Sequence, residues 1–411
     1  MNVLSLFDGM SCGQQALERA GFKVDNYFAS EIDKYAIKVT MANYPNTVQL
    51  GSVIDVDGYK LPKIDLLIGG SPCQSFSFAG KRKGMSTKDE QEILTLEHYL
   101  QLKSEGFEFE GQSYLFWEFM RLLNEVKPKY FLLENVMMGE KWEKILSKAI
   151  GVNPIMINSS LVSAQNRQRL YWTNIGMQPG GLFGDMESII EQPKDKGVLL
   201  KDILETEVDE KFFLSEKMIN GLIKGTEKHK EAGNGFLWQP RKEFGKATCL
   251  RANAAFGKTD NSIIVHNTQR RNPYRPSTLK NKNADGSGHL SKSDGKSYCL
   301  DSSQSNAIEI KERKIIQLSN NNKSNGGTQP FQQDRFYDIN GISPSLQAQL
   351  PGGSHIINTP NIRRLTPIEC EKLQTVKDNY TNHVSDSQRY KMLGNGWTVD
   401  VIAHIFKYIK L

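Results

Sequence analysis

One cysteine of the chain stands where a nucleophile can work. Cys73 lies in a Gly-Ser-Pro-Cys-Gln turn that follows the apolar stretch 64–68. The turn after a buried strand of this kind lies at the carboxyl edge of the sheet, where catalytic and binding residues of open α/β folds are found. The thiolate is the nucleophilic form of cysteine, and such a turn gives it access to a substrate. Because free cysteines are more often simply buried, this stretch alone favours a core cysteine over a nucleophile.

A carboxylate and two arginines extend this pattern. Glu134 follows the apolar strand 130–133, so it reaches the same sheet edge as Cys73 if both strands are parallel. A carboxyl group buried at that edge can hold or donate a proton. Arg167 and Arg169 alternate, which puts them on one face of an extended segment. They can face the carboxylate and a substrate carbonyl, although surface arginines are the ordinary alternative.

The amino-terminal segment has the form of a ligand-binding turn. An apolar strand at 3–6 is followed by a glycine turn at 7–13 and then by a helical pattern. This arrangement presents backbone N–H groups to a small polar ligand, although an ordinary tight turn explains it about as often. Glu31 ends a second strand at 27–30, where doubly wound folds bind ribose hydroxyls. Capping of the next helix is the alternative role, and Asp33 suits it better.

The strands and helices alternate over most of the chain. Helices are predicted at 114–126, 141–150 and 401–409, a strand at 154–158, and a helix through Leu373 that opens with a capping box. Alternation of this kind predicts an α/β fold with a doubly wound parallel sheet. A basic loop at 78–90, bounded by glycines, is a candidate lid, or else a mobile surface loop.

Composition restricts the class of protein. The 411 residues include five cysteines without metal-ligand spacing, so we expect neither a disulfide framework nor a metal site. A reducing cytoplasm fits that cysteine usage. The amino terminus does not resemble a secretion signal, and no run approaches the roughly 18 apolar residues of a membrane span.

The middle of the chain is basic. Residues 239–323 hold 16 Lys and Arg against 7 Asp and Glu, which exceeds the net charge of +6 of the whole chain. This excess predicts a surface that faces a polyanion. Three weakly similar units at 245–252, 295–302 and 341–348 predict repeated hairpins, although short matches in a low-complexity background also arise by chance.

Taken in order, these motifs closely resemble the cytosine carbon-5 DNA methyltransferases. The resemblance rests on Pro-Cys-Gln at 72–74, Glu-Asn-Val at 134–136 and Gln-x-Arg-x-Arg at 165–169. It also rests on the opening turn at 6–9 and the closing turn at 393–399. Those two turns are most similar to the vertebrate de novo branch and its phage and bacterial relatives. The resemblance implies a Rossmann-like S-adenosylmethionine-dependent methyltransferase sheet from 1–177 and 361–411. Residues 178–360 then form a smaller, mostly β target-recognition domain.

The same resemblance implies roles for individual residues. Cys73 adds to cytosine carbon 6, while Glu134 contacts ring N3 and the exocyclic amine. Arg169 binds the 2-carbonyl, and Arg167 orients Glu134 and the loop that carries Cys73. The cytosine must be flipped out of the duplex to be reached. Further substrate contacts are expected from Gln74, Ser75, Asn135 and Gln165.

The implied methyl donor, S-adenosylmethionine, lies over the first glycine turn. Its expected contacts are Phe7, Asp8, Gly9, Met10, Ser11, Cys12, Glu31, Ile32, Ser52, Val53, Pro72, Asn395, Gly396 and Trp397. One departure concerns the adenine amine, which the family usually holds with an Asp after the glycine of its third motif. Here Ser52 follows Gly51, so Ser52 or Asp55 must take that role.

The resemblance also implies partners. Double-stranded DNA is the expected substrate, a cognate restriction endonuclease is a candidate partner, and the chain is expected to act as a monomer in the cytoplasm of a bacterial or phage-infected cell. Methylation of RNA is the first alternative, but that branch has a smaller recognition insert. A catalytically silent DNA-binding relative is the second, and it predicts damaged motifs, whereas both Pro-Cys-Gln and Glu-Asn-Val are intact. The DNA sequence that is recognised depends on how far side chains of the hairpins reach into the groove, so it does not follow from the residue types.

Overall fold

The structure, a computed structural model, describes residues 1–72, 86–87, 92–180, 185–231, 233, 238, 240–242, 244–250, 262–265 and 361–410. The chain divides into two compact units. The first takes in the described residues of Met1–Leu204, Arg241–Asn261 and Leu365–Leu411, and the second those of Glu205–Pro240 and Ser262–Arg364. Within the described ranges, no helix has the length and apolar character needed to cross a membrane.

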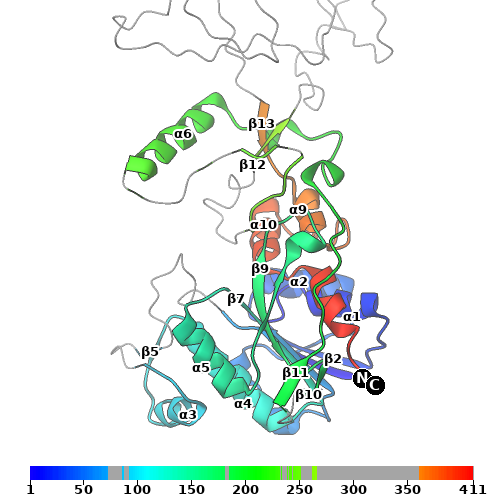
Figure 1. Cartoon of the computed structure of the whole chain (residues 1–411), viewed down its shortest axis with the longest axis vertical. Helices are drawn as coiled ribbons and strands as arrows, with labels where there is room; N and C mark the ends of the chain where they lie inside the picture. Colours follow the sequence, from blue (N-terminus) through cyan, green and yellow to red (C-terminus); the bar gives the residue numbers. More distant parts are fainter. Residues whose placement is uncertain are drawn as a thin grey trace, which may run out of the picture. The chain divides into compact units, whose positions relative to one another are not determined.

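A seven-stranded sheet forms the centre of the first unit (Figure 1). Its strands are, in spatial order, β3 (Val48–Gln49), β2 (Asn26–Ser30), β1 (Asn2–Leu6), β4 (Leu66–Gly70), β7 (Tyr130–Val136), β9 (Gln168–Thr173) and β8 (Ile155–Asn158). The first five run parallel, and β9 is antiparallel to both of its neighbours. The central strands β1 and β4 are apolar and buried almost throughout, as expected for strands covered on both faces. The predicted doubly wound sheet is therefore confirmed.

The order of the strands reverses beside β1. The chain runs outward from β1 to β2 and β3, then returns to place β4 on the other side of β1. Open α/β sheets bind ligands at such a reversal, outside the carboxyl ends of the strands. The turn that begins at Phe7 and the turn that begins at Ser71 both leave the sheet at this point. The sequence motifs of interest are thus directed to one crevice.

The helices of this unit pack on the sheet and on one another. They are α1 (Cys12–Ala20), α2 (Lys34–Asn43), α3 (Leu96–Ser104), α4 (Phe116–Val126), α5 (Glu140–Ile150), α9 (Pro367–Leu373), α10 (Asp386–Asn395) and α11 (Val399–Phe406). Asp33 caps α2 by accepting hydrogen bonds from the N–H groups of Tyr35 and Ala36, as predicted. The capping box of Thr366 and Glu369 at the start of α9 is also confirmed. The first helix α1 packs against the last helix α11, which brings both ends of the chain together (Figure 1).

Short elements complete this unit. The 3-10 helices are η1 (Val53–Asp55), η2 (Gly58–Lys60), η3 (Ser113–Leu115), η4 (Ser159–Leu161) and η5 (Leu200–Asp202). Two antiparallel pairs join β5 (Ser86–Thr87) to β6 (Phe109–Glu110), and β10 (Met177–Gly180) to β11 (Asp185–Ser188).

The second unit is described only in part. It contains η6 (Glu210–Phe212), α6 (Glu216–Glu231) and an antiparallel pair of β12 (Ser262–Val265) and β13 (Asn361–Arg364). The strand β12 follows the first repeated unit in the chain, and the helix α6 was not predicted from the sequence. The repeated units at 295–302 and 341–348 lie outside the described residues. The assignment of 178–360 to a target-recognition domain stays a prediction.

Gly13 offers a test of how closely the first turn is packed. A Cβ atom there would lie 2.5 Å from Cδ1 of Ile68 and 2.7 Å from the hydroxyl oxygen of Tyr27. We expect Gly13→Ala to lower the free energy of unfolding by about 1–3 kcal/mol in chemical denaturation, because a packed core must shift to admit the methyl group. Gly139→Ala is the control, since nothing lies within 4 Å of its Cβ position. Equal losses in the two variants would contradict this close packing.

Candidate active site

Glu134 lies at the sheet edge predicted for it. The strands β4 and β7 are parallel, and Gly70 is paired in register with Glu134. The residue is 8% exposed. A Cβ atom on Gly70 would lie 3.0 Å from Oε2 of Glu134 and 3.0 Å from Nε1 of Trp397. Glycine at the end of β4 therefore leaves the space that this carboxyl group occupies.

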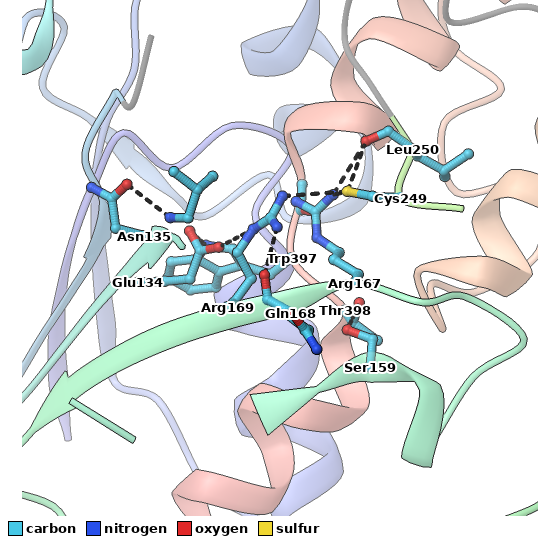
Figure 2. A network of polar contacts seen from close by, with 12 residues as sticks. Glu134, Asn135, Ser159, Arg167, Gln168, Arg169, Cys249, Leu250, Trp397 and Thr398 are labelled. Carbon is cyan, nitrogen blue, oxygen red and sulfur yellow. Dashed lines mark hydrogen bonds and ion pairs between the residues drawn. The ribbon is translucent and has the colours of Figure 1, made fainter. Parts of the chain in front are cut away.

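Two side chains fix the Glu134 carboxylate. Nε of Arg169 lies 2.9 Å from Oε1, and the indole Nε1 of Trp397 donates to Oε2 at 3.2 Å (Figure 2). Arg167 was the arginine expected to orient Glu134, whereas in the structure the ion pair is made by Arg169. Trp397 was expected at the cofactor, and its bond to the acid was not anticipated. With one partner on each oxygen, the plane of the carboxyl group is set.

Arg167 is held differently from Arg169. It is 3% exposed and donates to the carbonyl oxygens of Leu250, Gly394 and Gly396 at 3.3, 3.2 and 3.0 Å. These bonds fasten the turn that carries Trp397. Its connection to Glu134 in the structure is therefore indirect, through the position of the indole. The predicted role of Arg167 toward the loop of Cys73 stays a prediction.

The residues predicted to contact the substrate fall into two groups. Asn135 is 1% exposed and donates to the hydroxyl oxygen of Ser71 at 3.0 Å, so it holds the segment that leads into Pro72. Gln165 is fully buried, and its amide nitrogen and oxygen have no hydrogen-bond partner among the described residues. The remaining predicted residues Cys73, Gln74 and Ser75, and most of the loop at 78–90, lie outside the described residues.

The first glycine turn is tied to the end of β2. Phe7, Gly9 and Ser11 have φ angles of 57°, 58° and 62°, so the backbone is left-handed at alternate positions. The N–H of Gly9 donates to Oε2 of Glu31 at 2.8 Å, and Oε1 of Glu31 accepts from the N–H groups of the next two residues. Ile32 beside it is 71% exposed. An exposed apolar side chain next to a fixed carboxylate suits a flat ring joined to a ribose.

The closing turn packs onto the first. A Cβ atom on Gly396 would lie 2.8 Å from Cε of Met10 and 3.4 Å from Sγ of Cys12. Met10 and Cys12 are buried, together with Ser11, while Asn395 is exposed and Pro72 is partly buried. Burial raises the pKa of the Cys12 thiol to about 12, so this thiol is inert at neutral pH.

The crevice fits the predicted adenosyl ligand in three respects. Ile32 presents an apolar surface, Glu31 presents a carboxylate, and Oδ2 of Asp8 is buried with no hydrogen-bond partner among the described residues. Val53 is buried, and the hydroxyl of Ser52 caps η1 by accepting from the N–H of Ile54 at 3.3 Å. Within the described ranges, no group of three His, Cys, Asp or Glu residues could hold a metal ion.

Asp8 makes the free energy of unfolding depend on pH. Burial raises the pKa of this carboxyl from 3.8 to about 6, although the nearby hydroxyl groups of Ser5, Ser11 and Tyr27 act in the opposite direction; Tyr27 donates to Oδ1 at 2.8 Å. The folded state therefore binds the proton more tightly than the unfolded chain. The resulting stabilisation amounts to at most about 3 kcal/mol. It is fully present below about pH 4 and is lost as the pH rises through about 6. The free energy of unfolding of the wild type, minus that of Asp8→Asn, should fall over this range in chemical denaturation. A flat difference would contradict it.

The doubly wound sheet reverses its strand order beside β1 and carries an acid on β7, and the family model that matches the chain places this fold among the methyltransferases. The family described as C-5 cytosine-specific DNA methylase matches residues 1–411, and the chain belongs to that family. The protein is accordingly a DNA cytosine-5 methyltransferase, and the family implies S-adenosylmethionine as methyl donor.

Individual relatives agree with this placement. The chain is 28% identical to the orphan methyltransferase M.SPRI of Bacillus phage SPR, over 99% of this chain and 97% of the relative. It is 26% identical to the type II methyltransferase M.BanI of Aneurinibacillus aneurinilyticus, over 96% and 91%. The solved structure of Entamoeba histolytica methyltransferase EhMeth is similar in fold, with a TM-score of 0.56 at 13% identity over 99% of this chain and 97% of the other.

Proposed function

We propose that the protein methylates carbon 5 of cytosine at a specific sequence in duplex DNA, through a covalent adduct with Cys73. The observation that carries this proposal is the Glu134 carboxyl group, held by Arg169 and Trp397 at the end of β7. It lies beside the end of β4, from which the chain continues into Pro72 and Cys73. A fixed acid and guanidinium beside a thiol are the groups that activation of a pyrimidine requires.

The chemistry follows from the electronic structure of cytosine. Carbon 5 is not nucleophilic by itself, so the Cys73 thiolate adds to carbon 6 and makes carbon 5 enamine-like. Glu134 contacts ring N3 and the exocyclic amine and neutralises the charge that develops as sulfur adds. Arg169 binds the 2-carbonyl. Three contacts of Arg169 are present, from Nε to Glu134, from Nη1 to the carbonyl of Gln168 and from Nη2 to the sulfur of Cys249. A guanidinium group has five N–H donors, so two remain for a substrate carbonyl.

S-adenosylmethionine, when bound over the first glycine turn, supplies the methyl group as an electrophile to carbon 5. Glu31 and Ile32 hold the ribose and the adenine, and Ser52 or Asp55 takes the adenine amine. Loss of the proton from carbon 5 and expulsion of the Cys73 thiolate from carbon 6 then restore the ring double bond. Gln74, Ser75, Asn135 and Gln165 are the proposed contacts to the base, and the loop at 78–90 is the candidate lid.

Duplex DNA is the substrate that the chain favours. A base stacked in a duplex is out of reach of the thiol, so the cytosine is flipped out. The excess positive charge of residues 239–323 suits the phosphate backbone. Phage and type II relatives support protection of DNA as the biological use, within restriction-modification or phage antirestriction. In that setting the protein works as a monomer in the cytoplasm, with or without a cognate endonuclease.

Two assays test the proposal. Bisulfite sequencing of DNA from cells that express the chain should reveal 5-methylcytosine at one short sequence or a few. Methylation confined to RNA, or no methylation, would overturn the assignment. A duplex that carries 5-fluorocytosine at the target tests the adduct, because fluorine cannot leave as a cation and the protein stays attached on a denaturing gel. Cys73→Ala should give no attached species.

A further inference from the structure

A second thiol lies against the two arginines of the site. Sγ of Cys249 is 3.2 Å from Nη1 of Arg167 and 3.5 Å from Nη2 of Arg169 (Figure 2). Its segment belongs to the same compact unit as β9. The sequence analysis placed this cysteine only in a repeated unit of the recognition domain, and no motif indicated its contact with residues 80 positions earlier.

The backbone around Cys249 fixes the position of the sulfur. The N–H of Ala247 donates to the carbonyl of Ala164 at 2.7 Å, and the carbonyl of Ala247 accepts from the N–H of Asn166 at 2.9 Å. Lys246 adds a bond from Nζ to the carbonyl of Ser160. Segments 164–166 and 246–247 therefore run side by side, just before the two arginines and just before Cys249. This backbone pairing places the thiol next to Arg167 and Arg169.

Arg167, Arg169 and Glu134 together have a net positive charge. Arg167 is buried, the side chain of Arg169 is 14% exposed, and Glu134 supplies one negative charge against their two positive charges. Burial, the largest influence, raises the pKa of the Cys249 thiol, but the two guanidinium groups outweigh it and lower the pKa below its ordinary value. The lowered pKa favours the thiolate, which would supply a second negative charge. Among the described residues, these two arginines are the charged groups in contact with the sulfur, and Glu134 contacts Arg169.

We infer that Cys249 is a positioning residue for methyl transfer: its sulfur holds Arg167 and Arg169 side by side, so that Arg169 keeps its place against Glu134. This inference rests on the proposed function. Arg169 contacts Glu134 through Nε and the carbonyl of Gln168 through Nη1. Its Nη2 contacts the sulfur at 3.5 Å, an ordinary length for a hydrogen bond to sulfur, so the Cys249 contact fixes the third corner of the guanidinium group.

Kinetics of Cys249 variants test the inference. Cys249→Ala should lower kcat about tenfold, since a contact to a charged group is lost, and should leave the KM for S-adenosylmethionine unchanged. Cys249→Ser keeps a polar atom in place but does not ionise near neutral pH. At neutral pH the serine variant should recover most of the wild-type kcat. Its profile of kcat against pH should lack the step that ionisation of the thiol produces in the wild type. Cys370→Ser, at a buried cysteine on α9, is the control and should keep the wild-type pH profile.

The outcomes separate the two proposals. If the wild type methylates DNA and both Cys249 variants keep its kcat and its pH profile, Cys249 has no positioning role while the proposed function stands. If the wild type transfers no methyl group to DNA, the proposed function fails and this inference falls with it. Denaturation curves for each variant distinguish a changed site from a lost fold, and a folded Cys249→Ser protein with an unshifted profile would be sufficient to overturn the inference.

Discussion

Glu134→Gln should lower kcat for DNA methylation by about 10²–10³-fold, with little change in the KM for S-adenosylmethionine. Glutamine keeps the shape of the side chain and can still accept a hydrogen bond from Trp397. It cannot pair as an anion with Arg169, and it cannot share a proton with ring N3 as charge develops on the pyrimidine. The loss therefore falls on the step in which the thiolate adds. Single-turnover methylation of a duplex, measured at saturating S-adenosylmethionine, isolates that step.

Glu125→Gln is the matched control. Glu125 forms an ion pair with Arg121 at 2.7 Å, and its side chain is 14% exposed, close to the 11% of Glu134. This pair lies on α4 and should affect stability without affecting methyl transfer. If both glutamine variants lose activity equally, loss of a buried ion pair rather than loss of the acid explains the effect, and Glu134 is not the group that activates the base.

Cys73→Ala should reduce methylation to the background of the assay, a loss of about 10⁴-fold or more. Without the sulfur, carbon 5 of cytosine has no route to an enamine-like state, and none of the described thiols can replace it. Cys12 and Cys370 are buried, and Cys249 is engaged by the two arginines. Binding of DNA should persist, because affinity for the phosphate backbone comes mainly from cationic side chains, which this substitution leaves unchanged. Filter binding and methyl transfer, measured on one preparation, separate the two effects.

The contrast with Cys249→Ala sharpens this prediction. The two alanine variants remove the same atoms from different places, and only one of them should abolish the reaction. A Cys73→Ala protein with measurable turnover would refute the covalent mechanism, whereas complete inactivity of Cys249→Ala would indicate that the second thiol does more than position the arginines.

The sequence predicted the parts of the site that follow from local patterns. Glu134 follows a run of apolar strand residues, so strand periodicity was enough to place it at the end of β7. Arg167 and Arg169 were expected on one face of an extended segment; β9 begins between them at Gln168, and both guanidinium groups contact the sulfur of Cys249. The glycine turn, the capping box and the terminal helix are likewise local features with recognisable residues.

Contacts between distant segments could not be predicted in this way. Trp397 reaches Glu134 across 263 residues, and the partners of Arg167 are backbone carbonyls, which no residue type reveals. Cys249 offered no signal beyond its place in a weak repeat. The helix α6 was missed because its residues were read as part of a low-complexity segment; the spacing of Ile219, Leu222 and Ile223 is the helical signal that was available.

The bonds of Arg167 to Gly394 and Gly396 have a consequence for synthesis of the protein. The acid, the arginines and the first glycine turn all leave the ribosome long before the indole that steadies the acid. A nascent chain therefore holds Glu134 without Trp397 until residue 397 is made. Termination before position 394 yields a product that lacks both the indole and the carbonyls that bind Arg167, so we expect partially translated copies not to methylate DNA.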